Sequence, residues 1–200
     1  MTMPRKRPAH RPSRRTAVVK SAMRLFAAPT AAAVTVAEIA EAADMTTAAV
    51  YYHFASKDDI LLEGLRGFGE ALVAQSRQLQ QEAAADGTSI GLLPARLLAW
   101  LDGRRDEATV WFVTSAGVSL VVEQLRRELR GELVSILIQA AKTSRPDGGV
   151  AELSVIAVAL LSLLETVAAS WLTQDESFTG LGRRKFLEET CVLAERITGV

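Results

Sequence analysis

Side chains that can bind an anion lie close together in one short segment of this 200-residue chain. They are two threonine and two tyrosine hydroxyls, an imidazole and an ammonium group: Thr46, Thr47, Tyr51, Tyr52, His53 and Lys57. Such groups can donate hydrogen bonds to phosphate oxygens. The neighbouring Ala48 cannot hydrogen-bond a base edge, but its methyl group can pack on that of thymine. The segment therefore favours contacts with a nucleic acid.

Patterns typical of an enzyme are missing from the sequence. It contains no Gly-x-Ser-x-Gly elbow and no phosphate-binding glycine loop. The only histidines, His10 and His53, lie far apart, and Cys191 is the only cysteine, so no metal-ligand spacing exists. The paired carboxylates at 58–59 and 188–189 are better explained as helix caps and surface charge. We expect no enzyme, no metal and no cofactor.

Charge is unevenly distributed, although 23 basic and 23 acidic residues balance overall. Residues 1–66 hold ten basic and six acidic groups, a net +4, and residues 67–200 hold thirteen and seventeen, a net −4. A basic end on an acidic body indicates a polyanion-binding module, and a solubilising tail is the alternative. Residues 1–12 are expected to form a disordered basic arm, which either enters a minor groove or attracts DNA non-specifically.

Helical periodicity and capping patterns predict an all-α chain that positions these groups. Thr35 and Glu38 form a capping-box pattern, and Thr46 and Ser56 are further cap residues. The expected helices are 13–28, 35–43, 47–53, 57–84, 90–101, 107–141 with an interruption near 117, 150–173 and 181–197. On the helix around 118–141, one apolar stripe is predicted to be buried, with Arg126, Arg127 and Arg130 mostly facing away from it.

The segment from 35 to 57 has the organisation of a helix-turn-helix, in which the second helix enters the major groove. Ala40 and Ala43 are small enough for two helices to cross closely, and Val50 and Phe54 would anchor the second helix. The alternative is a helical bundle with the aromatic run in its core.

Residues 16–62 resemble the DNA-binding domain of the tetracycline-repressor (TetR) family of bacterial regulators. The matching residues are Leu25-Phe26, Ile39-Ala40-Glu41-Ala42-Ala43, Val50-Tyr51-Tyr52-His53-Phe54, Ser56-Lys57 and Leu61. The resemblance covers about a quarter of the chain, and the Tyr-Tyr-His-Phe-x-Ser-Lys run is its most specific part.

Two positions depart from the family pattern. The family usually has glycine where this chain has Thr30, followed by an aromatic residue where it has Ala31, and glycine where it has Asp44. Asp tolerates a left-handed conformation better than most residues, so the recognition turn is expected to form. A β-branched threonine does not, so the pattern leaves the conformation of the loop at 29–34 open.

The resemblance implies a helix-turn-helix head at 13–62 and a helical body at 63–200 that dimerises and binds a ligand. It implies phosphate contacts from Thr35, Tyr51, His53 and Lys57, and base contacts from Thr46, Thr47, Ala48 and Tyr52. The expected protein is a cytoplasmic repressor that binds a palindromic double-stranded DNA operator as a homodimer. A small hydrophobic effector would release it. The alternative is a ligand-independent architectural DNA-binding protein.

Apolar residues of the body are candidates for both remaining functions. Candidates for a ligand pocket are Phe68, Leu72, Leu97, Trp100, Trp111, Phe112 and Ser115. Candidates for the dimer interface are Leu160, Leu164, Ala168, Trp171, Phe186, Leu187, Cys191 and Ala194, and half of them are expected to fill the intrachain core instead. The apolar run at 153–164 is short for a membrane span, so no membrane association is expected.

Charged and glycine positions of the body allow two further hypotheses. Arg104 and Arg105 either meet an anionic head group or lie on a solvated turn. Gly64, Gly67 and Gly69 either soften the helix that joins head and body or allow a neighbouring helix to pack closely.

Overall fold

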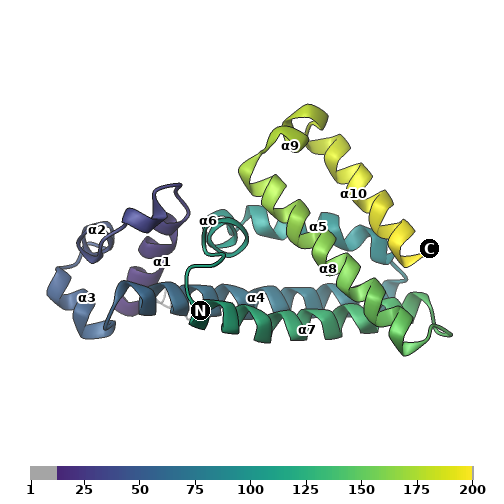
Figure 1. Ribbon diagram of the computed structural model, residues 1–200, viewed down its shortest axis with the longest axis horizontal. Coiled ribbons are helices and arrows are strands. Elements are labelled where there is room, and N and C mark those ends of the chain that lie inside the picture. The colour runs from purple at the N-terminus through teal and green to yellow at the C-terminus, as the bar shows by residue number, and fades with distance from the viewer. Residues whose placement is uncertain (1–12, 200) are drawn as a thin grey trace, which may run out of the picture.

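The computed structural model describes residues 13–199, so the expected arm at 1–12 lies outside the described residues. Every element in the described range is helical, which confirms the predicted all-α class. A small group of helices (α1–α3) lies at one end of the elongated molecule, and the remaining helices form a larger body (Figure 1). Helix α4 (Lys57–Asp86) runs from this head into the body.

The head consists of α1 (Arg14–Phe26), α2 (Val36–Ala42) and α3 (Thr47–His53). The predicted capping box is confirmed: the hydroxyl of Thr35 accepts from the Glu38 amide, and the Glu38 carboxylate accepts from the Thr35 amide at 2.7 Å. Thr46 caps α3 by accepting from the Ala49 amide at 3.2 Å, also as predicted. Asp44 has a φ of 54°, so it adopts the left-handed conformation expected in the recognition turn.

The loop before α2 avoids the strain that Thr30 would cause in a left-handed turn. Thr30 has a φ of −88°, and a short 3-10 helix, η1 (Ala31–Ala33), follows it. A single 3-10 turn therefore stands where the family pattern has a turn at glycine. Helix α1 is shorter than predicted, because Ser13 is its cap and the chain leaves the helix after Phe26.

Apolar side chains of all three helices fill the core of the head. Val18, Ile39 and Val50 are fully buried, and Phe54 is nearly so. The guanidinium of Arg15 lies 4.1 Å above the Phe54 ring, pairs with Glu63 of α4 and donates to a main-chain carbonyl at the end of α3. Arg15 therefore ties α1 to both α3 and α4.

The body adds eight elements to the described chain after α4. They are η2 (Ile90–Leu92), α5 (Leu93–Asp102), α6 (Arg105–Thr109), η3 (Val110–Thr114), α7 (Leu120–Ser144), α8 (Val150–Thr173), α9 (Glu176–Leu181) and α10 (Arg183–Thr198). Helix α7 packs against both α4 and α8. The apolar stripe predicted on α7 is confirmed as buried: Val122, Leu125, Leu129, Leu133, Ile136 and Ala140.

The body is divided into more helical elements than predicted. The segment predicted to be helical over 107–141 with an interruption near 117 comprises α6, the π-helical turn η3 and α7, and the interruption is confirmed at Gly117, which has a φ of 73°. The helix predicted over 181–197 corresponds to α10, and Gly182, with a φ of 74°, separates it from the short helix α9, which was not predicted. Pro94 lies in the first turn of α5, as predicted, but residues 90–92 form a separate 3-10 helix.

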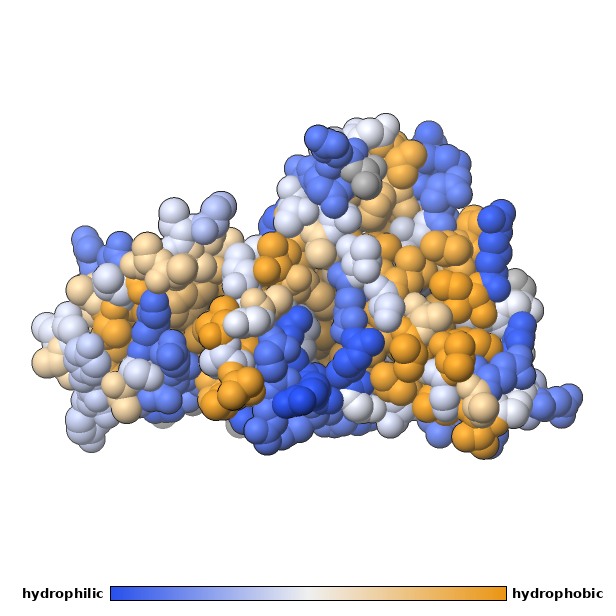
Figure 2. Space-filling view, in the orientation of Figure 1, coloured by the Kyte–Doolittle hydropathy of each residue, from blue (hydrophilic) through white to orange (hydrophobic). Residues whose placement is uncertain are grey.

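Helix α8 matches its predicted bounds and is long and apolar enough, by length and composition, to cross a membrane. The core helix of a soluble protein has the same properties, and α8 buries nine of its residues in this chain. Its exposed positions include Val155 and Val158, which are 69% and 45% exposed. Figure 2 shows several apolar patches on one face of the body, separated by hydrophilic side chains.

Candidate nucleic-acid interface and effector cavity

Helix α3 presents one polar and aromatic face to solvent. Thr46, Thr47 and Ala48 are exposed at its start, and Tyr51 and Tyr52 are 54% and 86% exposed in its second turn. Because Tyr52 is 86% exposed, most of its apolar ring lies in water, which is unfavourable. A binding partner that covers the ring would remove this cost. The structure therefore exposes five of the eight predicted DNA contacts together, on α3 and its cap residue.

The other three predicted contacts have partners within the head. Thr35 is exposed, but its amide and hydroxyl both donate to Glu38, and these bonds lower the pKa of that carboxyl. The Lys57 ammonium donates to the Ala32 carbonyl at 3.1 Å, which links α4 to the loop before α2. His53 is half-buried, and its ring meets the edge of the Tyr52 ring with centroids 5.2 Å apart. To contact a phosphate, the Lys57 side chain would have to leave or share this bond.

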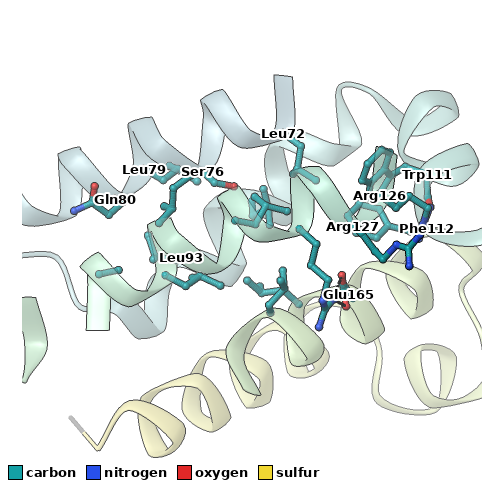
Figure 3. Close-up of a pocket in the computed structure, with 18 of the residues that line it drawn as sticks. Leu72, Ser76, Leu79, Gln80, Leu93, Trp111, Phe112, Arg126, Arg127 and Glu165 are labelled. Carbon is teal, nitrogen blue, oxygen red and sulfur yellow. Dashed lines mark hydrogen bonds and ion pairs between the residues drawn. The ribbon is translucent and has the colours of Figure 1, made fainter. Parts of the chain in front are cut away.

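A cavity of about 310 Å³ lies in the body between α4, α5, η3, α7 and α8 (Figure 3). Its wall is mainly apolar, formed by Leu72, Leu79, Leu93, Leu97, Trp111, Phe112, Leu133, Ile136, Leu137, Ala140, Leu161 and Leu164. This volume is at the lower end of the range of small-molecule sites, about 300–1,000 Å³.

Four of the seven predicted pocket residues line this cavity, namely Leu72, Leu97, Trp111 and Phe112. Phe68, Trp100 and Ser115 are not in its wall. Phe68 lies in an aromatic cluster, with its ring centroid 5.7 Å from that of Trp100 and 5.9 Å from that of Trp111. Ser115 is buried beyond η3. The aromatic residues thus form one cluster, of which only part reaches the cavity.

Sequence reasoning missed the charged part of the cavity wall. Arg126, Arg127 and Arg130 of α7 line it together with Glu123 and Glu165, although these arginines were predicted mostly to face away from the buried stripe. They flank the stripe, and long arginine side chains can cover apolar surface while the charged group lies elsewhere. Arg104 and Arg105 do not line this cavity: Arg104 pairs with Glu107, and Arg105 donates to the Leu172 carbonyl at 2.7 Å.

Arg126 is the most deeply placed of the three arginines, with its side chain only 22% exposed. It donates to the Trp111 carbonyl and, at 3.2 Å, to the Ser115 hydroxyl, and its guanidinium lies 5.0 Å from the centre of the Trp111 ring. Burial lowers the pKa of Arg126, against the opposing effect of Glu123 and Glu165. Arg130 pairs with Glu165 across the α7–α8 contact.

The π-helical turn η3 connects this arginine to the head. The Thr114 hydroxyl, at the end of η3, donates to the carbonyl of Phe26, the last residue of α1, at 2.8 Å. Arg126 bonds to Trp111 in the same turn. A chain of contacts therefore runs from the cavity wall to the end of α1.

The glycines of α4 differ in their surroundings. A Cβ atom added at Gly69 would meet Leu129 and come within 2.9 Å of the Trp111 ring, and one at Gly64 would come within 2.9 Å of Met23. A Cβ atom at Gly67 would have nothing within 4 Å. Close packing accounts for Gly64 and Gly69, and only Gly67 remains available for the softening hypothesis.

Most residues predicted for the dimer interface are buried within this chain. Leu160, Ala168, Trp171, Phe186 and Ala194 are all in the core, and the Trp171 indole donates to Asp102 at 2.9 Å. Leu164, Leu187 and Cys191 are half-buried, and Leu164 lines the cavity. The apolar periodicity of α8 and α10 thus marks mainly the intrachain core, and a partner would meet exposed residues such as Val155, Val158 and Leu193 instead.

Comparison with known proteins extends these observations. Residues 18–63 match the family described as bacterial regulatory proteins, tetR family. The HTH-type transcriptional repressor KstR2 of Mycobacterium tuberculosis is 38% identical over 72 residues, which are 36% of this chain and 36% of that relative. The chain thus matches only about a third of the length of this curated relative.

Solved structures are similar over nearly the whole chain, at low sequence identity. The fatty acid degradation regulator FadR from Bacillus halodurans has a TM-score of 0.74 at 14% identity, covering 96% of this chain and 97% of its own. FadR from Bacillus subtilis, solved with stearoyl-CoA, has a TM-score of 0.72 at 15% identity, covering 92% and 97%. The likeness shows a shared fold that includes both head and body.

Proposed function

We propose that this chain, which carries the DNA-binding domain of the tetR family of bacterial regulatory proteins, is a ligand-responsive transcriptional repressor. The observation that carries the proposal is the exposed face of α3 on a helix-turn-helix whose two helices are both N-capped by threonine side chains, within the segment that matches the family. In this proposal residues 13–62 are the DNA-binding domain, and residues 63–200 bind the effector and dimerise. The protein works where DNA is, in the cytoplasm.

The proposed DNA contacts divide by chemistry. Thr46, Thr47, Ala48 and Tyr52 would meet base edges, where the three hydroxyls can hydrogen-bond and the alanine can pack on a thymine methyl. Thr35, Tyr51, His53 and Lys57 would contact phosphates and so fix the position of α3 on the duplex. Affinity should fall steeply with salt, because phosphate contacts release counterions.

Dimerisation is supported by the outer face of α8. Val155 and Val158 lie exposed on a helix whose other side is in the core, together with the uncharged Ser162 and Thr166. Two copies related by a two-fold axis would present two α3 helices to half-sites about 34–36 Å apart, or a multiple of that spacing. The operator would accordingly be a palindrome.

The effector is proposed to occupy the cavity in the body. Its mainly apolar wall suits a small hydrophobic molecule, and one neighbour of the same fold was solved with stearoyl-CoA, which carries a long acyl chain. A preformed cavity in contact with the helix that enters the head favours this proposal over the architectural alternative, which needs no cavity.

Selection of binding sites from a random duplex library, using the full chain, tests the proposal. We expect an inverted repeat with a fixed half-site spacing. Recovery of unrelated duplexes, with an affinity that follows only the salt concentration, would contradict sequence-specific regulation and support the architectural alternative.

Two variants at equally exposed positions locate the interface. Tyr52→Ala should weaken binding to the selected site about tenfold, since removing its hydroxyl leaves a covered polar group of the duplex unsatisfied, at a cost of about 1–3 kcal/mol. Leu120→Ala is the matched control, because Leu120 of α7 is 87% exposed and Tyr52 is 86% exposed. Loss of affinity in both variants, or in neither, would contradict a DNA interface on α3.

A further inference from the structure

The effector cavity has two chemically different ends. Figure 3 shows Leu79 and Gln80 at one end, and Arg126 and Arg127 near Trp111 and Phe112 at the other. Aliphatic side chains form the wall between them. A wholly apolar ligand would satisfy the middle of this cavity and make no contact with the charged groups of the guanidinium end.

The charges at the arginine end do not balance. Arg126, Arg127 and Arg130 face two carboxylates, Glu123 and Glu165, among the described residues of the wall. Glu165 pairs with Arg130. Glu123 accepts the Gly117 amide at 2.9 Å and lies 4.0 Å from Arg126. Three cations against two anions leave an excess of one positive charge.

Two guanidinium groups remain available to an anion. Arg127 lines the cavity as an exposed residue and makes no hydrogen bond or ion pair with any residue in the range 13–199. Arg126 is mostly buried and donates its hydrogen bonds to a neutral carbonyl and a neutral hydroxyl, while the carboxylate of Glu123 lies 4.0 Å away, beyond hydrogen-bond distance. A buried cation is costly unless an anion compensates it, and a planar guanidinium matches carboxylate and phosphate oxygens.

We propose that the effector is an amphiphile whose apolar chain lies along the leucine-lined part of the cavity and whose anionic head group binds Arg126 and Arg127. The head group is a carboxylate or a phosphate. This inference rests on the proposed function, because it takes the cavity as the effector site, and it adds the chemical class of the effector.

Arg126 also gives the head group a route to the DNA-binding domain. An anion that draws Arg126 away from the Trp111 carbonyl removes a bond that holds η3 in its π-helical form. Such turns are rare and often occur at functional sites. Because Thr114 of η3 holds the end of α1, rearrangement of η3 would move the head. A neutral ligand that fills only the apolar part does not touch Arg126. It therefore cannot favour the rearranged form of η3 over the π-helical form in the same way.

Matched probes test the head group. Binding of dodecanoate, dodecyl phosphate, dodecanol and dodecyltrimethylammonium to the full chain is followed by calorimetry and by intrinsic tryptophan fluorescence, to which Trp111 in the cavity wall contributes. We expect one or both anions to bind about tenfold or more tightly than the alcohol, and the cation to bind most weakly. The ratio between carboxylate and phosphate identifies which head group the site prefers.

Variants assign the effect to residues. Arg127→Gln should lower the affinity for the preferred anion about tenfold and leave dodecanol binding unchanged. Arg104→Gln is the control, because Arg104 is an arginine of the body outside the cavity wall. Thr114→Val should bind the anion normally and show a reduced release of DNA, because it lacks the hydroxyl that bonds to α1.

Equal affinity for dodecanol and both anions, or binding of none of the probes, would overturn the inference. A normal palindromic site in the library selection, combined with either result, would leave the repressor proposal standing. Charge-selective binding of the amphiphiles without any sequence-specific DNA binding would contradict the repressor proposal and leave the proposed head-group site standing. The two proposals therefore fail separately.

Discussion

The candidate functional residues of the head lie on its outer surface, whereas those of the body surround an internal cavity. In the head the core is filled by residues such as Ile39 and Val50, and the functional side chains of α3 point outward. In the body the candidate side chains point inward, around about 310 Å³ of space. A surface that must match the fixed spacing of a duplex benefits from a close-packed support, whereas a site that admits a guest needs room.

One arginine in each region shows the same contrast between the surface of the head and the interior of the body. Arg15 in the head is held on the surface by Glu63, and its guanidinium covers the ring of Phe54. Arg126 in the body is mostly buried and bonds to main-chain and hydroxyl oxygens. The head thus uses a cation to fasten its helices together, while the body keeps one beside a cavity.

Truncation of one isoleucine in each region is expected to give the largest difference in stability. Ile39→Ala should lower the free energy of unfolding by about 2–5 kcal/mol, because a fully buried side chain leaves a new void. Ile136→Ala should cost less, near the lower end of that range, because Ile136 already borders the cavity and loses fewer contacts. Urea unfolding followed by circular dichroism measures both, and equal losses would contradict the contrast in packing.

Two glycines of α4, the helix shared by both regions, give the next largest effect. Gly69→Ala should destabilise the protein by about 1–3 kcal/mol, because its methyl group would overlap Leu129 and Trp111. Gly67→Ala has open space and should stabilise it by about 0.5–1 kcal/mol. Thermal unfolding measures both changes.

The same pair tests whether flexibility of α4 couples the two regions. If Gly67 softens α4, Gly67→Ala should also reduce the release of DNA by an anionic amphiphile, since a stiffer helix transmits less bending. An unchanged release at higher stability would show that α4 moves as a rigid element. A stabilising effect of Gly69→Ala would contradict the packing between α4 and α7.

The head could be predicted from the sequence because its signals are local. Thr35 and Glu38 lie three residues apart, Thr46 caps the helix that begins at the next residue, and Asp44 adopts the positive φ expected from its position. Each of these features involves neighbours in the chain, so the residue types alone specify the geometry. The loop at 29–34 was the exception. Thr30 excludes the left-handed turn of the family pattern, but the residue types do not specify which other conformation the loop adopts.

The body was less predictable because its features depend on contacts between distant segments. Arg126 bonds to a residue 15 positions earlier, and Thr114 to one 88 positions earlier. Charged residues are mostly exposed, so the sequence favoured solvent for the arginines of α7. Apolar periodicity marks the buried faces of α8 and α10 but cannot distinguish burial against the same chain from burial against a partner, which is why Trp171 and Ala194, both buried within this chain, were among the candidates for an interface.

The smallest expected effect compares one surface carboxylate in each region. The pKa of Glu38 is lowered by hydrogen bonds from the amide and hydroxyl of Thr35, and that of Glu189 by its pairing with Lys185. A carboxyl with a lowered pKa in the folded state contributes stability above its unfolded pKa, and this contribution is lost as the pH falls through the folded value. Both carboxylates should therefore stabilise the protein at neutral pH and cease to do so in acid.

Salt separates the two contributions. An exposed ion pair such as Glu189–Lys185 is screened by salt, whereas the neutral donors of Thr35 keep their bonds to Glu38. Glu38→Gln retains an acceptor for the capping box but removes the carboxyl group that becomes protonated in acid. The thermal midpoint of this variant should therefore fall less than that of the wild type on acidification. The difference should be the same at low and at high salt. Glu189→Gln should reduce the acid sensitivity only at low salt. A salt-dependent effect at Glu38 would mean that charge rather than the capping box holds the start of α2, and the head would then resemble the body in its surface electrostatics.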